Sequence, residues 1–152
     1  MALKLGDSKE SIDGLFGVSD NTDVFNMNMY PLFSVHYNEK GLLDAWKMDI
    51  DSNTAEANPL FITNKGIVLG KSTLFDVLQQ YGTVGYEGDG MANYLYEKTT
   101  YGSFRSPTSM SSYFQIKAPE KVFVISFLFD KTTLKVTYIN VSWLPYARGD
   151  VD

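Results

Sequence analysis

Hydrophobic positions recur with a helical spacing in residues 65–82, where the pattern is clearer than elsewhere in the chain. Four apolar residues follow the i, i+3, i+4, i+7 spacing that places side chains on one face of a helix: Leu74, Val77, Leu78 and Tyr81. Ser72 suits the N-cap, because its hydroxyl can accept a hydrogen bond from the first turn. Gly82 suits the left-handed end of the helix. A helix this short is unstable alone in water, so we expect its apolar face to pack on a sheet.

A second helix of the same kind is predicted in residues 5–17. Its leading glycine and its cap serine match those of the later helix: Gly6 with Gly70, and Ser8 with Ser72. Its apolar stripe has three members: Ile12, Leu15 and Phe16. The N-cap is either Ser8 or Asp7, the latter in a capping box with Glu10.

Two β-hairpins are predicted from alternating apolar residues on either side of a short polar turn. The first covers residues 33–50 with its turn at 38–41, and the second covers residues 127–141 with its turn at 130–133. The second strands carry similar patterns: Leu43-x-Ala45-x-x-Met48-x-Ile50 and Leu134-x-Val136-x-x-Ile139-x-Val141. In both, the alternation slips by one residue midway, which indicates a β-bulge or a bend at equivalent places.

An apolar run, KVFVISFLF, covers residues 121–129 and predicts a strand that is either covered on both faces or borders a large core. We place this strand in the middle of the sheet. The preceding residues, within 83–119, are rich in Gly, Ser, Thr and Tyr and have no counterpart in the first half. Two further strands are predicted in this insertion, at 93–98 and 113–117.

Together these elements predict an α+β fold in a single domain, residues 1–152. The domain is expected to contain two tandem repeats, each a short helix packed on an antiparallel β-meander, with the insertion in the second repeat. The predicted boundaries are 3–51 for repeat one, 52–64 for the linker, 65–144 for repeat two and 145–152 for a loose tail.

This organisation resembles the β-lactamase-inhibitor-protein-like family and the related SmpA/OmlA outer-membrane lipoprotein domain. The resemblance is carried by LGDS with FG in residues 5–17 and by LGKS with YG in residues 69–82, with support from the strand pairs at 33–50 and 127–141. It implies a non-enzymatic protein-binding module of bacterial origin. The family's inhibitors have a disulfide in each repeat and the lipoproteins need a lipidated cysteine, whereas this chain has no cysteine. The resemblance therefore supports the fold more than either function.

The acidic composition argues against a nucleic-acid partner. The net charge is −5, and no cluster of Lys and Arg supplies the positive charge that a phosphate backbone attracts. No apolar run reaches the roughly 18 residues of a transmembrane helix. The first residues lack a charged segment followed by an apolar run, so no signal peptide is expected. We favour an exported bacterial protein lacking its signal peptide over a cytoplasmic protein.

Side chains suited to catalysis or metal binding are scarce. His36 is the only histidine and is expected to be exposed or hydrogen-bonded in a strand. The acidic residues after Met48 lack the glycine and glutamate of a calcium loop, and the glycines of 82–90 lack the Lys-Ser/Thr of a phosphate loop. The Arg148-Gly149-Asp150 triplet is attributed to chance in an acidic tail. We therefore expect no enzyme activity, catalytic residue, metal site or cofactor.

The insertion contains side chains that are typical of interaction surfaces. Tyrosine among Ser and Gly combines rigid contact area with adaptable hydrogen bonding, and Tyr and Arg are frequent interface hot spots. The candidate binding residues are Tyr94, Tyr96, Tyr101, Phe104 and Arg105. Arg105 is a candidate for bidentate binding of an acidic group. The competing interpretation is that the rings cover a sheet edge or fill the rim of the core.

Three functions are compatible with the sequence. A non-enzymatic protein-binding or inhibitory module, with another protein as its partner, agrees best with the resemblance, the missing catalytic groups and the aromatic insertion. The alternative is a structural or envelope-assembly component without a small-molecule site. A carboxylate-based hydrolase ranks third, since it requires two convergent carboxylates in a deep pocket.

Overall fold

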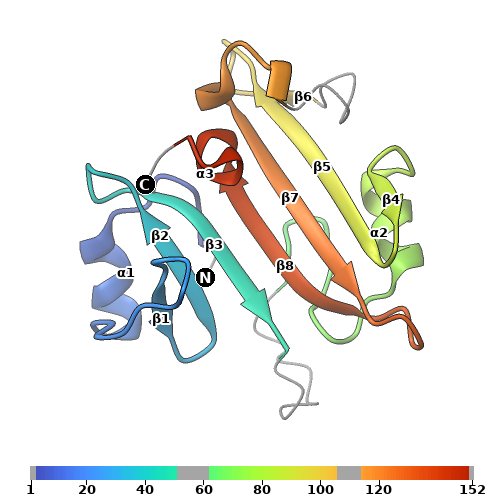
Figure 1. Ribbon diagram of the computed structural model, residues 1–152, viewed down its shortest axis with the longest axis horizontal. Helices are drawn as coiled ribbons and strands as arrows, with labels where there is room; N and C mark the ends of the chain where they lie inside the picture. Colours follow the sequence, from blue (N-terminus) through green and yellow to red (C-terminus); the bar gives the residue numbers. More distant parts are fainter. Residues whose placement is uncertain (1–2, 51–61, 106–113, 151–152) are drawn as a thin grey trace.

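The computed structural model describes residues 3–50, 62–105 and 114–150 (Figure 1). The elements follow the chain in this order: α1 (Lys9–Phe16), β1 (Asn28–Tyr30), β2 (Phe33–Tyr37), β3 (Leu43–Asp49), α2 (Leu74–Tyr81), β4 (Tyr86–Gly88), β5 (Met91–Lys98), β6 (Phe104–Arg105), the 3₁₀ turn η2 (Pro119–Lys121), β7 (Val122–Phe129), β8 (Val136–Trp143) and α3 (Leu144–Arg148). In these three ranges, every helix is too short or too polar to cross a membrane.

All strands join one antiparallel sheet, and the α+β fold class is confirmed. Neighbours follow the order β1-β2-β3-β8-β7-β5-β4, and β6 pairs with β5 outside this path. The two predicted hairpins meet through the β3–β8 pair, so the sheet is continuous across both halves of the chain (Figure 1). The strand expected in the middle, β7, lies between β8 and β5, and the central place of the order belongs to β8.

Both predicted hairpins are present, and each contains a register shift. The extra residue stands in the second strand of each hairpin, at Asp44 in β3 and at Thr137 in β8. Each shift closely follows the turn, after Gly41 and Leu134, which both have positive φ. The bulges were expected midway along these strands, so their predicted position is wrong. They lie next to the turn, where a bulge accommodates the change in strand twist.

Helices α1 and α2 pack on the same face of the sheet, near its two ends (Figure 1). Ile12 of α1, Val77 of α2 and Phe127 of β7 belong to one buried core. We call this side of the sheet the helical face. The stripe predicted for α2 is confirmed, with Leu78 half-buried at its margin. In α1 the stripe is narrower than predicted, because 57% of the Leu15 surface is exposed.

The two long helices begin alike, but α2 begins one residue later than predicted. Ser8 is the N-cap of α1, and its hydroxyl accepts from an amide of the first turn. Thr73, rather than Ser72, is the N-cap of α2, where the Asp76 carboxylate accepts from the Thr73 amide. The Ser72 hydroxyl instead accepts from the Val68 amide in the preceding loop. Because the Ser72 hydroxyl is engaged in this loop hydrogen bond, it does not cap the helix as the local pattern predicted.

The C-terminal residues form a helix, so the prediction of a loose tail is wrong for residues 145–148. α3 follows β8 directly, and Gly149 ends it in the left-handed conformation. Leu144 is fully buried in a small second core with Leu95, Val122 and Val124. This core lies on the side of the sheet away from α1 and α2, which we call the opposite face. Burial of Leu144 anchors the segment that the sequence left loose.

The two strands predicted in the insertion have different outcomes. Residues 93–98 belong to β5, as expected. Residues 114–117 contain no strand, and Phe114 lies in a 3₁₀ turn. The physical reason is that β7 is already paired on both edges, with β5 and β8, and offers no free edge to this segment. Residue 113 and most of the predicted linker, 52–61, lie outside the described residues.

Candidate functional site

A row of polar side chains crosses the opposite face of the sheet. Cross-strand pairing aligns five residues from β2, β3, β8, β7 and β5 in this order: Ser34, Lys47, Asn140, Ser126 and Asn93. Successive side chains of a strand alternate between faces, so this register brings all five to the face that is turned away from α1 and α2. We call these residues the polar row. Both halves of the chain contribute to it.

The polar row forms much of the floor of a depression of about 820 Å³. Four of its members line the depression, and Tyr138 and Ser142 flank them along β8. The rim is aromatic and basic: Phe25, Phe114, Tyr146 and Arg148. A concave site that combines aromatic side chains with a few convergent polar groups is the usual form of a binding site.

Lys47 of the polar row is held by a loop that places Phe25 at the rim. The Lys47 ammonium donates to one oxygen of Asp23, at 2.5 Å, and the other oxygen accepts from the amides of Phe25 and Met27. Burial raises the pKa of the Asp23 carboxyl, but the hydrogen bonds from Lys47 and the two amides outweigh it and hold the pKa below its usual value. The Phe25 ring centre lies 5.1 Å from the Lys47 ammonium, and 67% of Phe25 remains exposed.

Asn140, at the centre of the row, has unused hydrogen-bonding capacity. Its amide nitrogen donates to the Tyr138 hydroxyl at 3.3 Å. Its amide oxygen is buried, with no hydrogen-bond partner in the part of the chain that the structure describes. Burial raises the pKa of the Tyr138 phenol, and the charge of Asp49 adds to that rise, so Tyr138 is a neutral donor and acceptor at physiological pH.

Helix α3 forms one wall of the depression and covers a buried hydrogen bond between His36 and Asp44. The Tyr146 ring lies 4.5 Å from the His36 ring, and His36 Nδ1 is 2.6 Å from a carboxylate oxygen of Asp44. Both residues of this pair are about 5% exposed. Burial, and then the nearby Asp44, raise the pKa of Tyr146 to about 12. His36 is therefore a buried structural residue bonded to Asp44, one of the two situations that the sequence suggested.

Hydrogen-bonding side chains outnumber carboxylates among the described lining residues of the depression. Glu87 is the one carboxylate among its described lining residues, and carboxylate hydrolases of the common type need two. Lys47 is neutralised by Asp23. Within residues 3–50, 62–105 and 114–150, no three His, Asp or Glu side chains gather in a way that could hold a metal ion.

The aromatic candidates of the insertion do not form one surface. Tyr94 is 2% exposed, donates its hydroxyl to the Gly82 carbonyl and packs on Tyr81, so it is a core residue. Tyr96 shares its strand face, as expected, and its ring stacks on Phe123 at 5.4 Å. Tyr101 is 97% exposed in the turn after β5. The backbones of Phe104 and Arg105 form β6, opposite Lys98 and Glu97 of β5; their side chains lie outside the described part.

Sequence reasoning missed the polar row, because its members come from five strands and no two of them are close in the sequence. A weak signal was present. Ser126 interrupts the apolar run of β7, and Asn140 interrupts that of β8. A polar residue inside an otherwise apolar strand indicates a solvated or functional patch on one face, but only the register shows that the two interruptions are neighbours.

The Arg148-Gly149-Asp150 triplet is folded on itself. The Arg148 guanidinium donates to the Asp150 carboxylate, with 2.6 Å from Nε to the oxygen. Only 13% of the Arg148 side chain is exposed. The two charged side chains of the triplet are thus paired with each other.

Comparison with known proteins gives no match: no protein-family model, no curated protein and no solved structure is similar to this chain.

Proposed function

We propose that this chain is a non-enzymatic protein-binding or inhibitory module that contacts its partner through the polar row and the side chains around it. The observation that carries the proposal is the combination of a hydrogen-bonding floor with exposed aromatic rings at its edge. Phe25 is 67% exposed and Phe114 is 77% exposed, although both are large apolar residues. Exposed apolar groups that gather around a polar site indicate an interaction surface.

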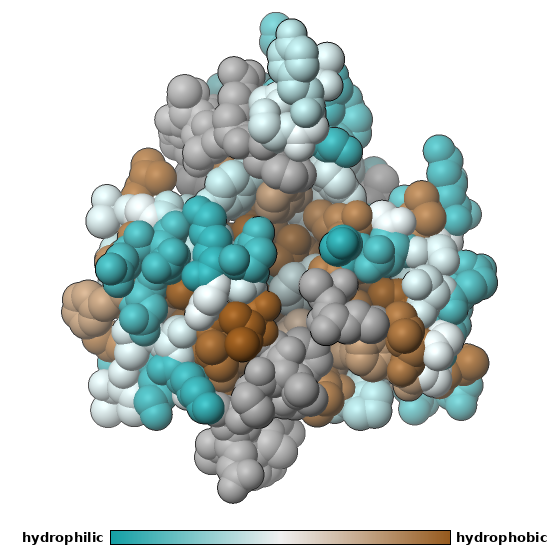
Figure 2. Space-filling model, turned by 180° about the vertical axis from the view of Figure 1, so that it is seen from behind, coloured by the Kyte–Doolittle hydropathy of each residue, from teal (hydrophilic) through white to brown (hydrophobic). Residues whose placement is uncertain are grey.

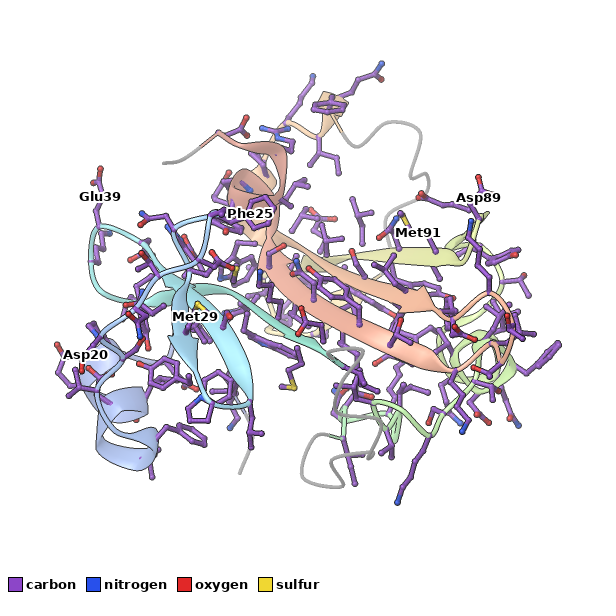
Figure 3. All side chains as sticks on the ribbon, turned by 60° about the horizontal axis from the view of Figure 1, so that its bottom comes forward. Asp20, Phe25, Met29, Glu39, Asp89 and Met91 are labelled. Carbon is purple, nitrogen blue, oxygen red and sulfur yellow. The ribbon has the colours of Figure 1, made fainter. Side chains whose placement is uncertain are left out.

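The apolar margin extends along the same side of the sheet. Met29, which pairs with Ser34, and Met91, which pairs with Leu128, point to the opposite face and are 48% and 38% exposed. Figure 3 shows Phe25 and Met91 on the side away from α1 and α2, with the floor strands between them. Methionine adapts its shape to a partner surface, and aromatic residues act as anchors.

The insertion of the second half contributes to this surface. Glu87, Asn93 and Phe114 all fall within residues 83–119 and line the depression. Most residues of the main core come from the helices and hairpins that recur in both halves. These three side chains of the insertion line the depression instead. A partner that binds here therefore contacts the segment in which the sequence placed the binding function, but through other residues than Tyr94 and Tyr96.

The geometry of the ionisable groups favours binding over catalysis. His36 is covered by Tyr146, Lys47 is held by Asp23, and Glu87 stands alone at the edge. Acid–base catalysis needs a proton donor or acceptor in reach of a substrate. Neutral amides, hydroxyls and a fixed lysine are suited to recognising polar backbone and side-chain groups of a protein.

A matched pair of substitutions tests the proposal. After capture of a partner from the native organism and its purification, affinities are measured by calorimetry for Phe25→Ala and Phe75→Ala. The two phenylalanines are equally exposed, at 67%, but Phe75 lies on α2, away from the polar row. We expect Phe25→Ala to weaken binding at least about tenfold, as a hot-spot residue does, and Phe75→Ala to have no effect.

Equal affinities of Phe25→Ala and the parent protein, or an equal loss in both variants, would remove the polar row as the contact surface. Tyr101→Ala and Arg105→Ala test the remaining residues of the insertion, which stay candidates for the same interface. Each is expected to cost more than about 1 kcal/mol of binding free energy if the turn after β5 also contacts the partner.

We further propose that the two halves derive from one duplicated unit. Equivalent backbone contacts support this: Gly6 N–H bonds to Leu43 C=O as Gly70 N–H does to Val136 C=O, and Ser8 bridges Leu42 as Thr73 bridges Lys135. These contacts align Ser8 with Thr73 and Leu43 with Val136, which shifts the sequence-based alignment by one and two residues.

The pairing between β3 and β8 is self-complementary under the same alignment. In this alignment Ala45 corresponds to Tyr138, and Ser142 corresponds to Asp49. The sheet contains both the pair Ala45–Ser142 and the equivalent pair Tyr138–Asp49. A pseudo-two-fold axis through Lys47 and Asn140, in the polar row, would have this effect. The arrangement supports the proposed duplication of one unit. In a crystal structure, a rotation that superposes α1 on α2 without superposing β3 on β8 would refute it.

A further inference from the structure

Between α1 and α2, the described residues of the helical face include an apolar strip that neither helix covers. There the sheet is hollowed by a trough of about 580 Å³. Its floor is formed by cross-strand neighbours of β3, β8 and β7: Trp46, Met48, Val141, Ile139, Ile125 and Trp143. We call this the apolar trough. Figure 2 views this face and shows hydrophobic side chains toward its middle.

Part of the floor of the apolar trough is less buried than the core on either side of it. Val77 of α2 and Phe127 of β7 are fully buried, whereas Trp46, Val141 and Trp143 are only half-buried. Among the described residues, the two helices therefore cover the ends of the sheet and leave part of its centre accessible. Both tryptophans of the chain stand in this strip.

The charged side chains among the described lining residues of the trough are both lysines, and neither forms an ion pair within the described ranges. Lys4 and Lys98 line it, with no Asp or Glu among its described lining residues, although the chain has 18 acidic and 13 basic residues. Neither ammonium group takes part in an ion pair within the described ranges. Lys98 ends β5, just beyond the Phe123–Trp143 pair. Two unpaired cations therefore border an apolar surface.

A buried hydroxyl in the trough also lacks a partner. Tyr81 is only 8% exposed, and its hydroxyl makes no hydrogen bond with the residues that the structure describes. Burial raises the pKa of the Tyr81 phenol, and the nearby Thr63 hydroxyl lowers it in part. The Thr63 hydroxyl accepts a hydrogen bond from the Ile67 amide and does not form one with Tyr81. A buried donor without a partner is costly, and a ligand oxygen would satisfy it.

We propose that the apolar trough binds a free long-chain carboxylate, with its hydrocarbon tail on the tryptophan-lined strip and its head group held by Lys98 and Lys4. The apolar floor matches the tail, and the volume lies within the usual range for small-molecule sites. The two cations, in an otherwise acidic chain, match a single negative head group. This ligand site is independent of the protein-binding surface proposed above, because it lies on the other face of the sheet.

Tryptophan fluorescence reports directly on this site, because both tryptophans line it. The full chain is titrated with dodecanoate below its micelle-forming concentration, and with dodecyltrimethylammonium and dodecyl maltoside, which have the same tail but a positive or an uncharged head group. We expect a saturable change in emission and a raised melting temperature with dodecanoate. Half-saturation should require about tenfold less dodecanoate than either analogue, since a charge-assisted contact is lost in them.

Two variants and one vesicle experiment separate the remaining explanations. Lys4→Gln combined with Lys98→Gln should raise the half-saturating dodecanoate concentration at least about fivefold. Lys131→Gln, an exposed lysine in the turn after β7, should leave it unchanged. No saturable change, equal responses to the three amphiphiles, or equal affinities of the double variant and the parent would each overturn the proposal. So would sedimentation with anionic phosphatidylglycerol vesicles in the absence of any response to monomeric dodecanoate, since that result assigns the cations to a membrane surface.

Discussion

Replacing Asp23 by alanine should release the loop that holds Phe25 over the polar row. One oxygen of the carboxylate accepts from the amides of Phe25 and Met27, at 2.9 and 3.0 Å, and the other accepts from the Lys47 ammonium. The charged side chains are mostly buried, with 14% of Asp23 and 16% of Lys47 exposed. The substitution removes three hydrogen bonds and leaves a lysine with no counter-ion in a poorly solvated place.

The expected loss of unfolding free energy is about 3 kcal/mol. Breaking a fully buried ion pair by removing one partner costs about 3 to 5 kcal/mol. The lower end applies, because Lys47 keeps some contact with water and can turn toward it. The two amide hydrogen bonds alone, each to a charged acceptor, account for a similar figure of about 3 kcal/mol, and the two estimates are not additive because water replaces part of each interaction.

Urea denaturation, followed by circular dichroism, measures this loss, and Asp20→Ala is the control. Asp20 lies in the same loop region, is exposed and has no ion pair or side-chain hydrogen bond among the described residues, so its substitution should change stability by less than about 0.5 kcal/mol. A loss below about 1 kcal/mol for Asp23→Ala, or equal losses in both variants, would refute the argument that Asp23 organises this loop.

The same interaction predicts a pH dependence. The pKa of Asp23 is lowered from 3.8 on folding, because the hydrogen bonds from Lys47, Met27 and Phe25 outweigh the effect of burial. A lowered pKa contributes stability that is fully present above the unfolded value and is lost as the pH falls through the folded value. The difference between the parent and Asp23→Ala should therefore shrink as the pH falls below 3.8. A difference that stays constant in this range would contradict the assigned hydrogen bonds.

Two further comparisons test the packing. Leu144→Ala should cost about 2 to 5 kcal/mol, because Leu144, the first residue of α3, is fully buried in the second core, whereas Leu15→Ala, at a position 57% exposed, should change stability by less than about 0.5 kcal/mol. Similar values for both variants would restore the interpretation of a loose tail. Gly14→Ala should stabilise α1 by about 0.5 to 1 kcal/mol, since a Cβ there meets open space. Gly85→Ala should destabilise, because its Cβ would lie 2.5 Å from the Asn93 carbonyl oxygen, and melting temperatures that move in the same direction for both variants would contradict this.

Local patterns determined the elements whose signals are short in range. The i, i+3, i+4, i+7 spacing predicted α2, and alternation on either side of a polar turn predicted both hairpins. Even here, local chemistry left the helix start ambiguous. Ser72 and Thr73 both have a hydroxyl suited to an N-cap, and the choice depends on the Val68 amide, which takes the Ser72 hydroxyl.

Segments whose conformation depends on distant partners were predicted poorly. The residues of α3 are too few to indicate a helix by themselves, and the segment is ordered because Leu144 fills a core made by β5 and β7. Phe114 was expected inside a strand, but both edges of β7 are already paired. Neither fact can be read from nearby residues, because each depends on which strands pair.

The candidate sites show the same division. The family resemblance, the scarcity of catalytic side chains and the aromatic insertion together predicted an interaction module, and the insertion identified tyrosine as the residue type of interest. Tertiary structure then placed Tyr94 in the core at 2% exposure and Tyr101 in solvent at 97%. It also brought Ser126 and Asn140, separated in the chain by a whole turn, into one polar row. Periodicity sets which residues share a face of their own element, whereas strand order and register set what that face meets.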